Sequence, residues 1–158
     1  DTLSLVGKEL LANNILVAKD FSSIPILRLN TDDIKQVLLN LILNARDAMP
    51  KGGTLKIATG TNSDGSVDLL VSDSGVGIPK RELERIFLPF YTTKETGSGT
   101  GLGLYSVHSA VKRAKGTINV HSQEGKGSVF TITLPSYEDG NKKIKRGGRR
   151  WKTSSKFS

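Results

Sequence analysis

Four glycines alternate between positions 97 and 103, directly before an apolar pattern of helical period. The first backbone N–H groups of a helix and the positive end of its dipole form an anion site, so this arrangement suggests phosphate. The spacing excludes two common phosphate loops. No Gly-Lys pair is followed by Ser or Thr, and leucines stand where a dinucleotide-binding loop has its third glycine. Residues 89–99 lack the alternation of a strand. We therefore expect a long loop that closes over a phosphate ligand from outside a sheet.

Composition places this loop in one globular domain. The chain is 36% hydrophobic and 24% charged, with no apolar run long enough to span a membrane. Its first residues lack the basic segment and cleavage site of a signal peptide. The absence of cysteine excludes disulfides and thiolate zinc sites. These features lead us to expect a cytoplasmic domain.

The net charge of +8 comes from one end of the chain. Residues 1–140 contain 15 basic and 15 acidic side chains, whereas residues 141–158 contain eight basic and no acidic ones. We therefore divide the chain into a domain over residues 1–137 and a basic tail over 138–158, which we expect to be disordered. Trp151 and Phe157 would let the tail stack on nucleic acid, but the neutral domain makes nucleic acid an unexpected partner.

Hydrophobic periodicity predicts an α+β fold. Hairpins predominate, so we expect an α/β sandwich whose mixed, mainly antiparallel sheet is covered on one face by helices. Thr31 is the candidate N-cap of the longest helix, and Pro79 stands at the first position of another. The predicted helices span residues 2–12, 31–50, 79–87 and 102–114, and the predicted strands span residues 15–20, 24–29, 54–60, 66–73, 116–122 and 127–135.

The longest predicted helix has a narrow polar stripe. At about 100° per residue, four polar side chains fall within about 80° of one another: Gln36, Asn40, Asn44 and Asp47. Apolar residues fill most of the remaining circumference, unlike in an ordinary surface helix. A buried amide costs roughly 2–7 kcal/mol without a partner. The stripe therefore either bonds nearby backbone and solvent or faces a polar ligand, and asparagine oxygens suit Mg²⁺.

Asp73 ends a predicted strand whose other inward positions are apolar. Two-residue alternation places it on one face with Val67, Leu69 and Val71, so its carboxylate points into the protein. A buried ionised carboxylate is very unfavourable without a donor, and the exocyclic amine of a purine would be one. Nearby glycines would let a flat ligand approach the backbone. The alternative interpretation is an ordinary turn aspartate.

The two histidines lack a catalytic pattern. His108 lies on the helix after the glycines and His121 on the polar face of a predicted strand, so we expect structural or exposed roles for both. The sequence contains no pair of residues at metal-ligand spacing, and without cysteine a nucleophilic triad has little support.

Taken together, four motifs resemble one family. In order, "NLILNARDA", "DSGVGIP", "IFLPFYTTK" and "GTGLGL" are similar to the N, G1, F and G2 boxes of the catalytic, ATP-binding domain of sensor histidine kinases, in the GHKL superfamily. The resemblance continues through "GTINVHSQEGKGSVFTITLP" and covers residues 5–135. Any one box would be weak, but four in order are specific. The resemblance implies an ATP-dependent protein histidine kinase that uses ATP and Mg²⁺, with the glycine run as the hinge of an ATP lid.

The resemblance also implies roles for individual residues. Asn44 would be the metal ligand, Asn40 its neighbour at the phosphates, and Lys94 a third catalytic residue that reaches the phosphates. Asp73 would accept from the adenine amine, and Asp47 stands where some histidine kinases have a basic residue, so its role stays open. The remaining nucleotide-binding positions would be Gly75, Gly77, Ile78, Phe87, Phe90, Thr92, Thr93, Gly99, Thr100, Gly101, Leu102, Gly103 and Leu104. Of these, the two phenylalanines would anchor the lid.

One position and one absence refine this expectation. The ATP-hydrolysing relatives carry Glu where Asn40 stands, as the base that activates water, and an amide cannot be that base. Phosphotransfer is therefore favoured over hydrolysis. In the family the acceptor is a histidine followed by an acid on a helical hairpin, but here a serine follows each of His108 and His121.

We therefore expect the acceptor to lie outside this chain. The resemblance implies two partners: the protein's own dimerisation and histidine phosphotransfer domain, and the receiver domain of a response regulator. The full-length protein would be a homodimer, and its relation to a membrane stays open. Two alternatives remain: a serine kinase of the anti-sigma type, which usually has Glu at position 40, and a non-catalytic, nucleotide-gated binding module.

Overall fold

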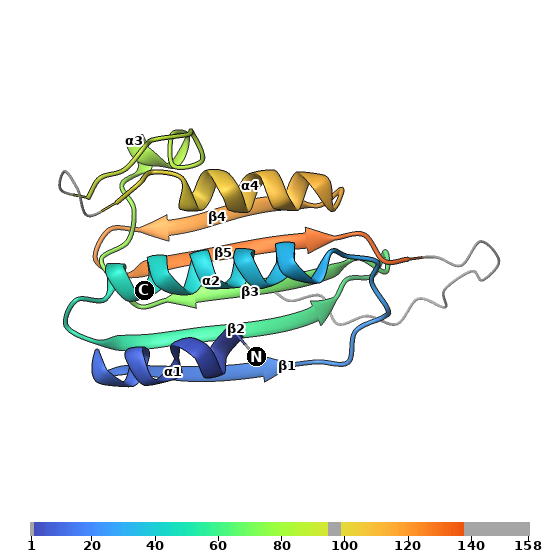
Figure 1. Cartoon of the computed structure of the whole chain (residues 1–158), viewed down its shortest axis with the longest axis horizontal. Helices are drawn as coiled ribbons and strands as arrows, with labels where there is room; N and C mark the ends of the chain where they lie inside the picture. Colours follow the sequence, from blue (N-terminus) through green and yellow to red (C-terminus); the bar gives the residue numbers. More distant parts are fainter. Residues whose placement is uncertain (1, 95–98, 138–158) are drawn as a thin grey trace.

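The computed structural model describes residues 2–94 and 99–137 as helices packed on one five-stranded sheet (Figure 1). Part of the expected lid, residues 95–98, and the expected basic tail, residues 138–158, lie outside the described residues. Within the described part, no helix has the length and apolar character needed to cross a membrane.

Helices and strands follow one another in the order that the sequence predicts, with one strand missing. The elements are α1 (Thr2–Ala12), β1 (Ile15–Phe21), α2 (Thr31–Ala48), β2 (Gly53–Thr61), β3 (Val67–Asp73), α3 (Lys80–Leu83), α4 (Gly103–Arg113), β4 (Thr117–Gln123) and β5 (Gly127–Leu134). The sheet order is β1-β2-β3-β5-β4. Strand β1 pairs with β2 in parallel, and the other three pairs are antiparallel. The expected mixed, mainly antiparallel sheet is confirmed.

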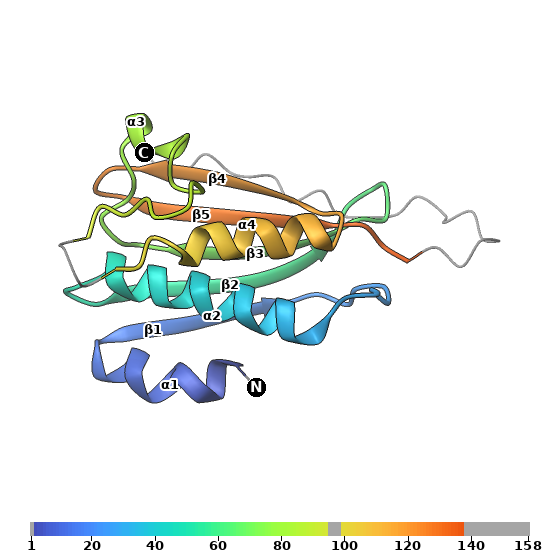
Figure 2. The same ribbon diagram turned by 45° about the horizontal axis from the view of Figure 1, so that its top comes forward.

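The helices α1, α2 and α4 lie side by side on the same face of the sheet in both views (Figures 1 and 2). Alternation explains which strand residues face them: every second residue of β3 is buried, and so are Phe130, Ile132 and Leu134 of β5. From the helical side, α2 contributes Val37, Leu41, Ile42 and Ala45 to the same core. The expected one-sided covering of the sheet is confirmed.

Helix α2 begins with a side-chain cap, but not the expected one. The side-chain oxygen of Asn30 accepts from the backbone N–H groups of Asp32, at 2.9 Å, and Asp33, at 3.3 Å. Thr31 is therefore the first residue of the helix rather than its N-cap. Asn and Thr are both favourable N-cap residues. The local sequence therefore does not distinguish Asn30 from Thr31 as the N-cap, and the backbone geometry decides for Asn30. The two aspartates lie in the first turn, as expected, where they favour the helix dipole.

Two further expectations were wrong. Residues 24–29 form no strand: Pro25 lacks the N–H that a ladder needs, and the segment leads from the end of β1 back to the start of α2. The helix expected over residues 79–87 has only four residues, with Pro79 as its N-cap. Beyond it the chain forms tighter turns, in which a backbone N–H donates to the carbonyl three residues earlier. These hydrogen bonds run from Arg85 N to Glu82 O at 2.8 Å and from Leu88 N to Arg85 O at 2.9 Å.

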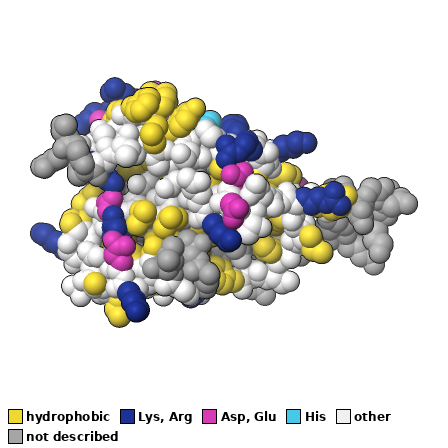
Figure 3. All heavy atoms as spheres, viewed as in Figure 1, with side chains coloured by type: hydrophobic (Ala, Val, Ile, Leu, Met, Phe, Trp, Pro, Cys, Tyr) yellow, Lys and Arg dark blue, Asp and Glu magenta, His cyan; other side chains and the backbone are white. Residues whose placement is uncertain are grey.

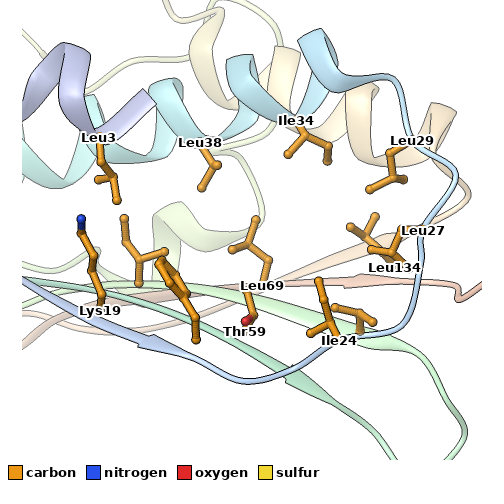
Figure 4. Close-up of a pocket in the computed structure, with 13 residues that line it drawn as sticks. Leu3, Lys19, Ile24, Leu27, Leu29, Ile34, Leu38, Thr59, Leu69 and Leu134 are labelled. Carbon is orange, nitrogen blue, oxygen red and sulfur yellow. The ribbon is translucent and has the colours of Figure 1, made fainter. Parts of the chain in front are cut away.

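An apolar cavity of about 320 Å³ lies between the first half of α2 and the sheet (Figure 4). Leu38 and Ile34 point into it from α2, and Leu69 from β3, and Lys19 is the one charged residue among the described residues that line it. None of the polar stripe of α2 lines this cavity. This cavity is therefore not the predicted nucleotide site, whose residues Asn40, Asn44 and Asp47 lie in the second half of α2.

Candidate nucleotide-binding site

Three separate segments meet the second half of α2. The loop after β3 reaches it through a hydrogen bond from Val76 N to Ala48 O at 2.9 Å. The start of α4 reaches it through a bond from Asn40 Nδ2 to Gly103 O at 3.3 Å. The segment before residue 95 reaches it through an ion pair of Lys94 with Asp47. Segments that are far apart in sequence thus gather at one end of the sandwich, on the left in Figure 1.

The polar stripe of α2 divides into exposed and half-buried members. As whole residues, Gln36 and Asp47 are exposed, although the Asp47 side chain is only 28% exposed, whereas Asn40 and Asn44 are half-buried. The Asn40 amide nitrogen donates to Gly103, and its oxygen accepts no hydrogen bond from the described residues. Among the described residues, Asn44 makes no side-chain hydrogen bond. A half-buried amide without a protein partner is available to bind a polar ligand.

The N-terminus of α4 presents backbone donors beside this stripe. Leu102 is the N-cap residue and supplies no side-chain cap, and no side chain of residues 2–94 or 99–137 accepts from the first N–H groups of the helix. The cap residue itself is held by a bond from Leu102 N to Thr100 Oγ1 at 3.3 Å. Leu104 packs against the core from the first turn. The start of α4 next to Asn40 therefore has the backbone donors that the anion site expected from the glycine run would need.

Asp73 lies at the end of β3 with a side chain that is 7% exposed. Its Oδ1 accepts from the backbone N–H of Gly75 at 2.9 Å, and no side chain among the described residues donates to it. Burial raises the pKa of the Asp73 carboxyl above its ordinary value, against the opposing effect of backbone hydrogen bonds from Gly75 and Ser128. The structure therefore contains a buried acceptor that is only partly satisfied by protein.

Backbone packing gives the glycines after Asp73 a role of their own. A Cβ on Gly75 would lie 2.3 Å from Ala48 O, and one on Gly77 would lie 2.0 Å from Gln123 O. Gly77 also has a φ of +72°. These glycines let the loop pass closely under the end of α2 and beside β4. The next residue, Ile78, is half-buried, and its N–H donates to Ser122 Oγ at 2.7 Å.

The two phenylalanines of the expected lid anchor have different environments. Phe87 lies 5.7 Å from the His108 ring and 6.5 Å from the Phe130 ring, centroid to centroid, so it joins α4 to the sheet. Phe90 is 76% exposed and has a φ of +64°. A Cβ on Gly101 would lie 2.4 Å from the carbonyl carbon of Phe90. Residues 90 and 101 therefore form the neck of the loop, and His108 packs against an aromatic ring, as a structural histidine would.

A chain of ion pairs lies along the end of α2. Asp47 accepts from Lys94 with one carboxylate oxygen and from Arg46 with the other, at 2.6 Å for Nη2, and Arg46 also binds Glu9 of α1. Burial acts to raise the pKa of Asp47, but the bonds from Lys94 and Arg46 outweigh it and hold the pKa below its ordinary value. Figure 3 looks onto this face, where basic and acidic side chains lie side by side.

Sequence reasoning singled out Lys94 and Asp47 but not Arg46 or Glu9. The sequence indicated a role for Arg46 only through its position beside Asp47. It gave no indication for Glu9, which lies 37 positions from Arg46 along the chain. Of the other expected positions, Thr92 and Thr93 are exposed, and Gly99 lies against the stem of Lys94.

A magnesium ion would need ligands beyond the protein at this site. In residues 2–94 and 99–137, no three His, Cys, Asp or Glu side chains group as a metal cluster would require. Mg²⁺ is commonly bound through one or two protein oxygens together with substrate phosphates and water. The Asn44 amide, which has no hydrogen bond among the described residues, would fit that pattern if a phosphate chain bound at the adjacent α4 terminus.

Comparison with known proteins decides the family. Residues 29–138 match the histidine kinase-, DNA gyrase B-, and HSP90-like ATPases. The chain belongs to this family. This ATPase-family domain is 47% identical over 137 residues to the sensor histidine kinase ZraS of Escherichia coli (strain K12), covering 85% of this chain and 28% of the relative. Sporulation kinase C of Bacillus subtilis (strain 168) is 38% identical over 138 residues, covering 86% of this chain and 32% of the relative.

Solved structures agree with this assignment. The catalytic domain of histidine kinase ThkA superposes with a TM-score of 0.74 at 31% identity, covering 85% of this chain and 88% of that one. Full-length ShkA in complex with AMPPNP gives a TM-score of 0.76 at 27% identity, covering 85% of this chain and 28% of that one. This ATPase-family domain is therefore a catalytic domain of the histidine kinase type, and it spans about a third or less of the curated relatives it matches.

Proposed function

We propose that this domain binds Mg·ATP between the second half of α2, the start of α4 and the end of β3, and transfers the γ-phosphate to a histidine on a separate helical-hairpin domain. The single observation that carries the proposal is the bond from Asn40 to Gly103, which places the polar stripe of α2 against the uncapped start of α4. Amide groups and free backbone N–H groups together suit a metal-bound phosphate chain.

Each group would act through a definite atom. The carboxylate of Asp73 accepts from the adenine amine, because burial leaves it in need of a donor. The N–H groups at the start of α4 bind the phosphates, and the Asn44 oxygen would hold Mg²⁺, which neutralises phosphate charge when bound. Such transfer depends on positioning and charge stabilisation more than on covalent chemistry by the protein. The residue at position 40 is an amide and so cannot serve as the base that hydrolysis would need.

The partners in this proposal follow from the two histidines of this chain, because neither His108 nor His121 is followed by the acidic residue of a phosphoacceptor site. A phosphoacceptor histidine on the protein's own dimerisation domain would receive the phosphate, and a response regulator receiver domain would take it next. In the full-length protein we expect a homodimer, because such an acceptor domain dimerises by helix pairing. The relatives named as sensor and sporulation kinases support this context, although this chain matches only 28% and 32% of them.

A titration tests the binding step and a transfer assay tests the chemistry. The 158-residue chain is titrated with a non-hydrolysable ATP analogue, with and without Mg²⁺, by calorimetry. We expect saturable binding that Mg²⁺ strengthens. The chain is then incubated with labelled Mg·ATP and a purified acceptor hairpin domain from a related kinase. Label on the acceptor histidine is the expected result, and nucleotide hydrolysis without any transfer would contradict the proposal.

A further inference from the structure

Asp47 stands three positions after Asn44 on α2, so its carboxylate lies on the same side of the helix as the proposed metal ligand. Through this carboxylate, Lys94 is held beside the site by an ion pair. The two side chains are 28% and 36% exposed, so the pair is only partly open to solvent. The lysine expected at the phosphates is thus bound to a carboxylate next to them.

Lys94 is held in place by more than this ion pair. Its backbone N–H donates to Thr92 Oγ1 at 3.1 Å. Gly99 crosses over its stem so closely that a Cβ there would lie 2.9 Å from Lys94 Cδ and 2.9 Å from Thr92 Oγ1. The stem of the side chain therefore packs against Gly99, whereas its ammonium group is held by Asp47.

Asp47 does not depend on Lys94 to the same degree. Its second oxygen accepts two bonds from Arg46, from Nε at 2.9 Å and from Nη2 at 2.6 Å. Arg46 is in turn fixed by Glu9 of α1. If Lys94 moved away, the Asp47 carboxylate would remain paired with a guanidinium. An exchange of partner by Lys94 therefore leaves Asp47 paired with Arg46, a cation that Asp47 shares with Glu9.

We propose that Asp47 and the nucleotide phosphates compete for the Lys94 ammonium, so that Asp47 lowers and thereby sets the affinity of the site for ATP. The inference rests on the proposed nucleotide site and concerns its regulation. A metal-bound triphosphate offers several anionic oxygens for charge-assisted bonds, whereas Asp47 offers the one that Arg46 does not occupy. A ligand without phosphates cannot bind the Lys94 ammonium, so its affinity does not depend on the ion pair between Lys94 and Asp47.

The test compares two ligands in four versions of the full chain: wild type, Asp47→Asn, Lys94→Met and the double variant. Calorimetry measures binding of a non-hydrolysable ATP analogue with Mg²⁺, and of adenosine. We expect Asp47→Asn to tighten binding of the analogue by about two- to fivefold, the size typical of a partly exposed ion pair. Lys94→Met weakens it, and in the double variant the gain from Asp47→Asn becomes markedly smaller. Adenosine binds all four versions equally.

A matched control comes from the other end of the same helix. Asp33 of α2 pairs with Arg113 of α4, with Arg113 Nη2 at 2.7 Å from Asp33 Oδ1. Asp33→Asn therefore breaks a similar ion pair at a distance from the proposed site, and it should leave the affinity for the analogue unchanged. A change of equal size in this variant would mean that the effect at Asp47 is general electrostatics.

Three results would overturn the inference. Weaker binding of the analogue by Asp47→Asn would mean that Asp47 supports Lys94 in the bound state. An equal gain with and without Lys94 would mean that the two residues are not coupled. If the wild type bound adenosine but not the analogue, the proposed phosphate site and this inference would both be wrong. The proposed adenine pocket would still be supported. Failure of both ligands to bind would instead remove the proposed function.

Discussion

The amide nitrogen of Asn40 donates to the carbonyl oxygen of Gly103 at 3.3 Å, across 63 positions of sequence. This bond joins the polar stripe of α2 to the first residue of α4. It also distinguishes the two asparagines of the stripe, because Asn44 makes no such bond among the described residues. Asn40 therefore has a structural role even without ligand, while Asn44 is free to serve a ligand alone.

Replacing Asn44 by alanine should remove most of the Mg²⁺ dependence of nucleotide binding and abolish phosphotransfer, with little change in thermal stability. The side chain has no hydrogen-bond partner to lose in residues 2–94 and 99–137. Asn40→Ala is the matched comparison: it breaks the bond to Gly103 and should lower the free energy of unfolding by about 0.5–1.5 kcal/mol. Calorimetry at two Mg²⁺ concentrations and thermal melts measure both effects. Normal transfer by Asn44→Ala to a supplied acceptor would rule out the metal role.

Asp73→Asn should weaken adenine nucleotide binding by about 1–3 kcal/mol, because an amide can turn a donor toward the adenine amine and leave a buried pair unsatisfied. Asp68→Asn on the same strand is the control. Its carboxylate bonds Thr133 Oγ1 at 2.6 Å rather than facing the core. Calorimetric affinities for an ATP analogue measure the difference. Unchanged affinity in Asp73→Asn would remove this residue from the adenine pocket.

As the pH falls, adenine binding should weaken at a higher pH than it would with an aspartate of ordinary pKa. Burial raises the pKa of Asp73 above the usual 3.8, so protonation begins at a higher pH as pH falls. Because the folded-state pKa is raised, protonation favours the folded state, and this contribution to stability is lost as pH rises through the raised value. Binding should therefore fall in the acid range before the fold is lost. Affinity and thermal melts across that range check this, and Asp73→Asn should lack the pH effect.

Two glycines of the same run should respond oppositely to alanine. Gly101 has a φ of +67°, and a Cβ there would lie 2.4 Å from a backbone atom of Phe90. Among the described residues, a Cβ on Gly103 would meet only Asn40, at 3.9 Å for Oδ1. We expect Gly101→Ala to lower the free energy of unfolding by about 1–3 kcal/mol, whereas Gly103→Ala keeps or raises it by up to about 1 kcal/mol. Chemical denaturation measures both, and equal losses would contradict the neck assignment.

The chain alone with Mg·ATP should acquire no phosphohistidine. His108 packs against Phe87, and His121 lies on β4, an edge strand. A serine follows each, so neither has an acidic neighbour to take the imidazole proton. Mass spectrometry under alkaline conditions checks this. An acceptor domain added in trans should become labelled, though weakly, because the tether and its effective concentration are missing. A label on either histidine would mean that the chain carries its own acceptor.

Most of the fold was readable from local pattern. Alternation in β3 and β5 and helical period in α2 and α4 each depend on neighbouring residues only, so the elements and the one-sided sheet could be predicted. The same holds for the inward direction of Asp73 and for the family, since four ordered motifs are a property of the sequence. Locally ambiguous signals failed: the brief apolar run at 24–29 forms no strand, and the helix at Pro79 ends after one turn.

The sequence by itself determined which elements form, which residue types carry the chemistry and which family the chain joins. Only the tertiary structure decided that Asn40 binds Gly103 while Asn44 has no hydrogen-bond partner in the described part of the chain, that the Gly101 backbone forms a neck with Phe90, and that Lys94 binds Asp47. The physical reason is distance along the chain. Periodicity reports how a residue relates to its neighbours three or four positions away, but these contacts join positions brought together by packing the helices on the sheet.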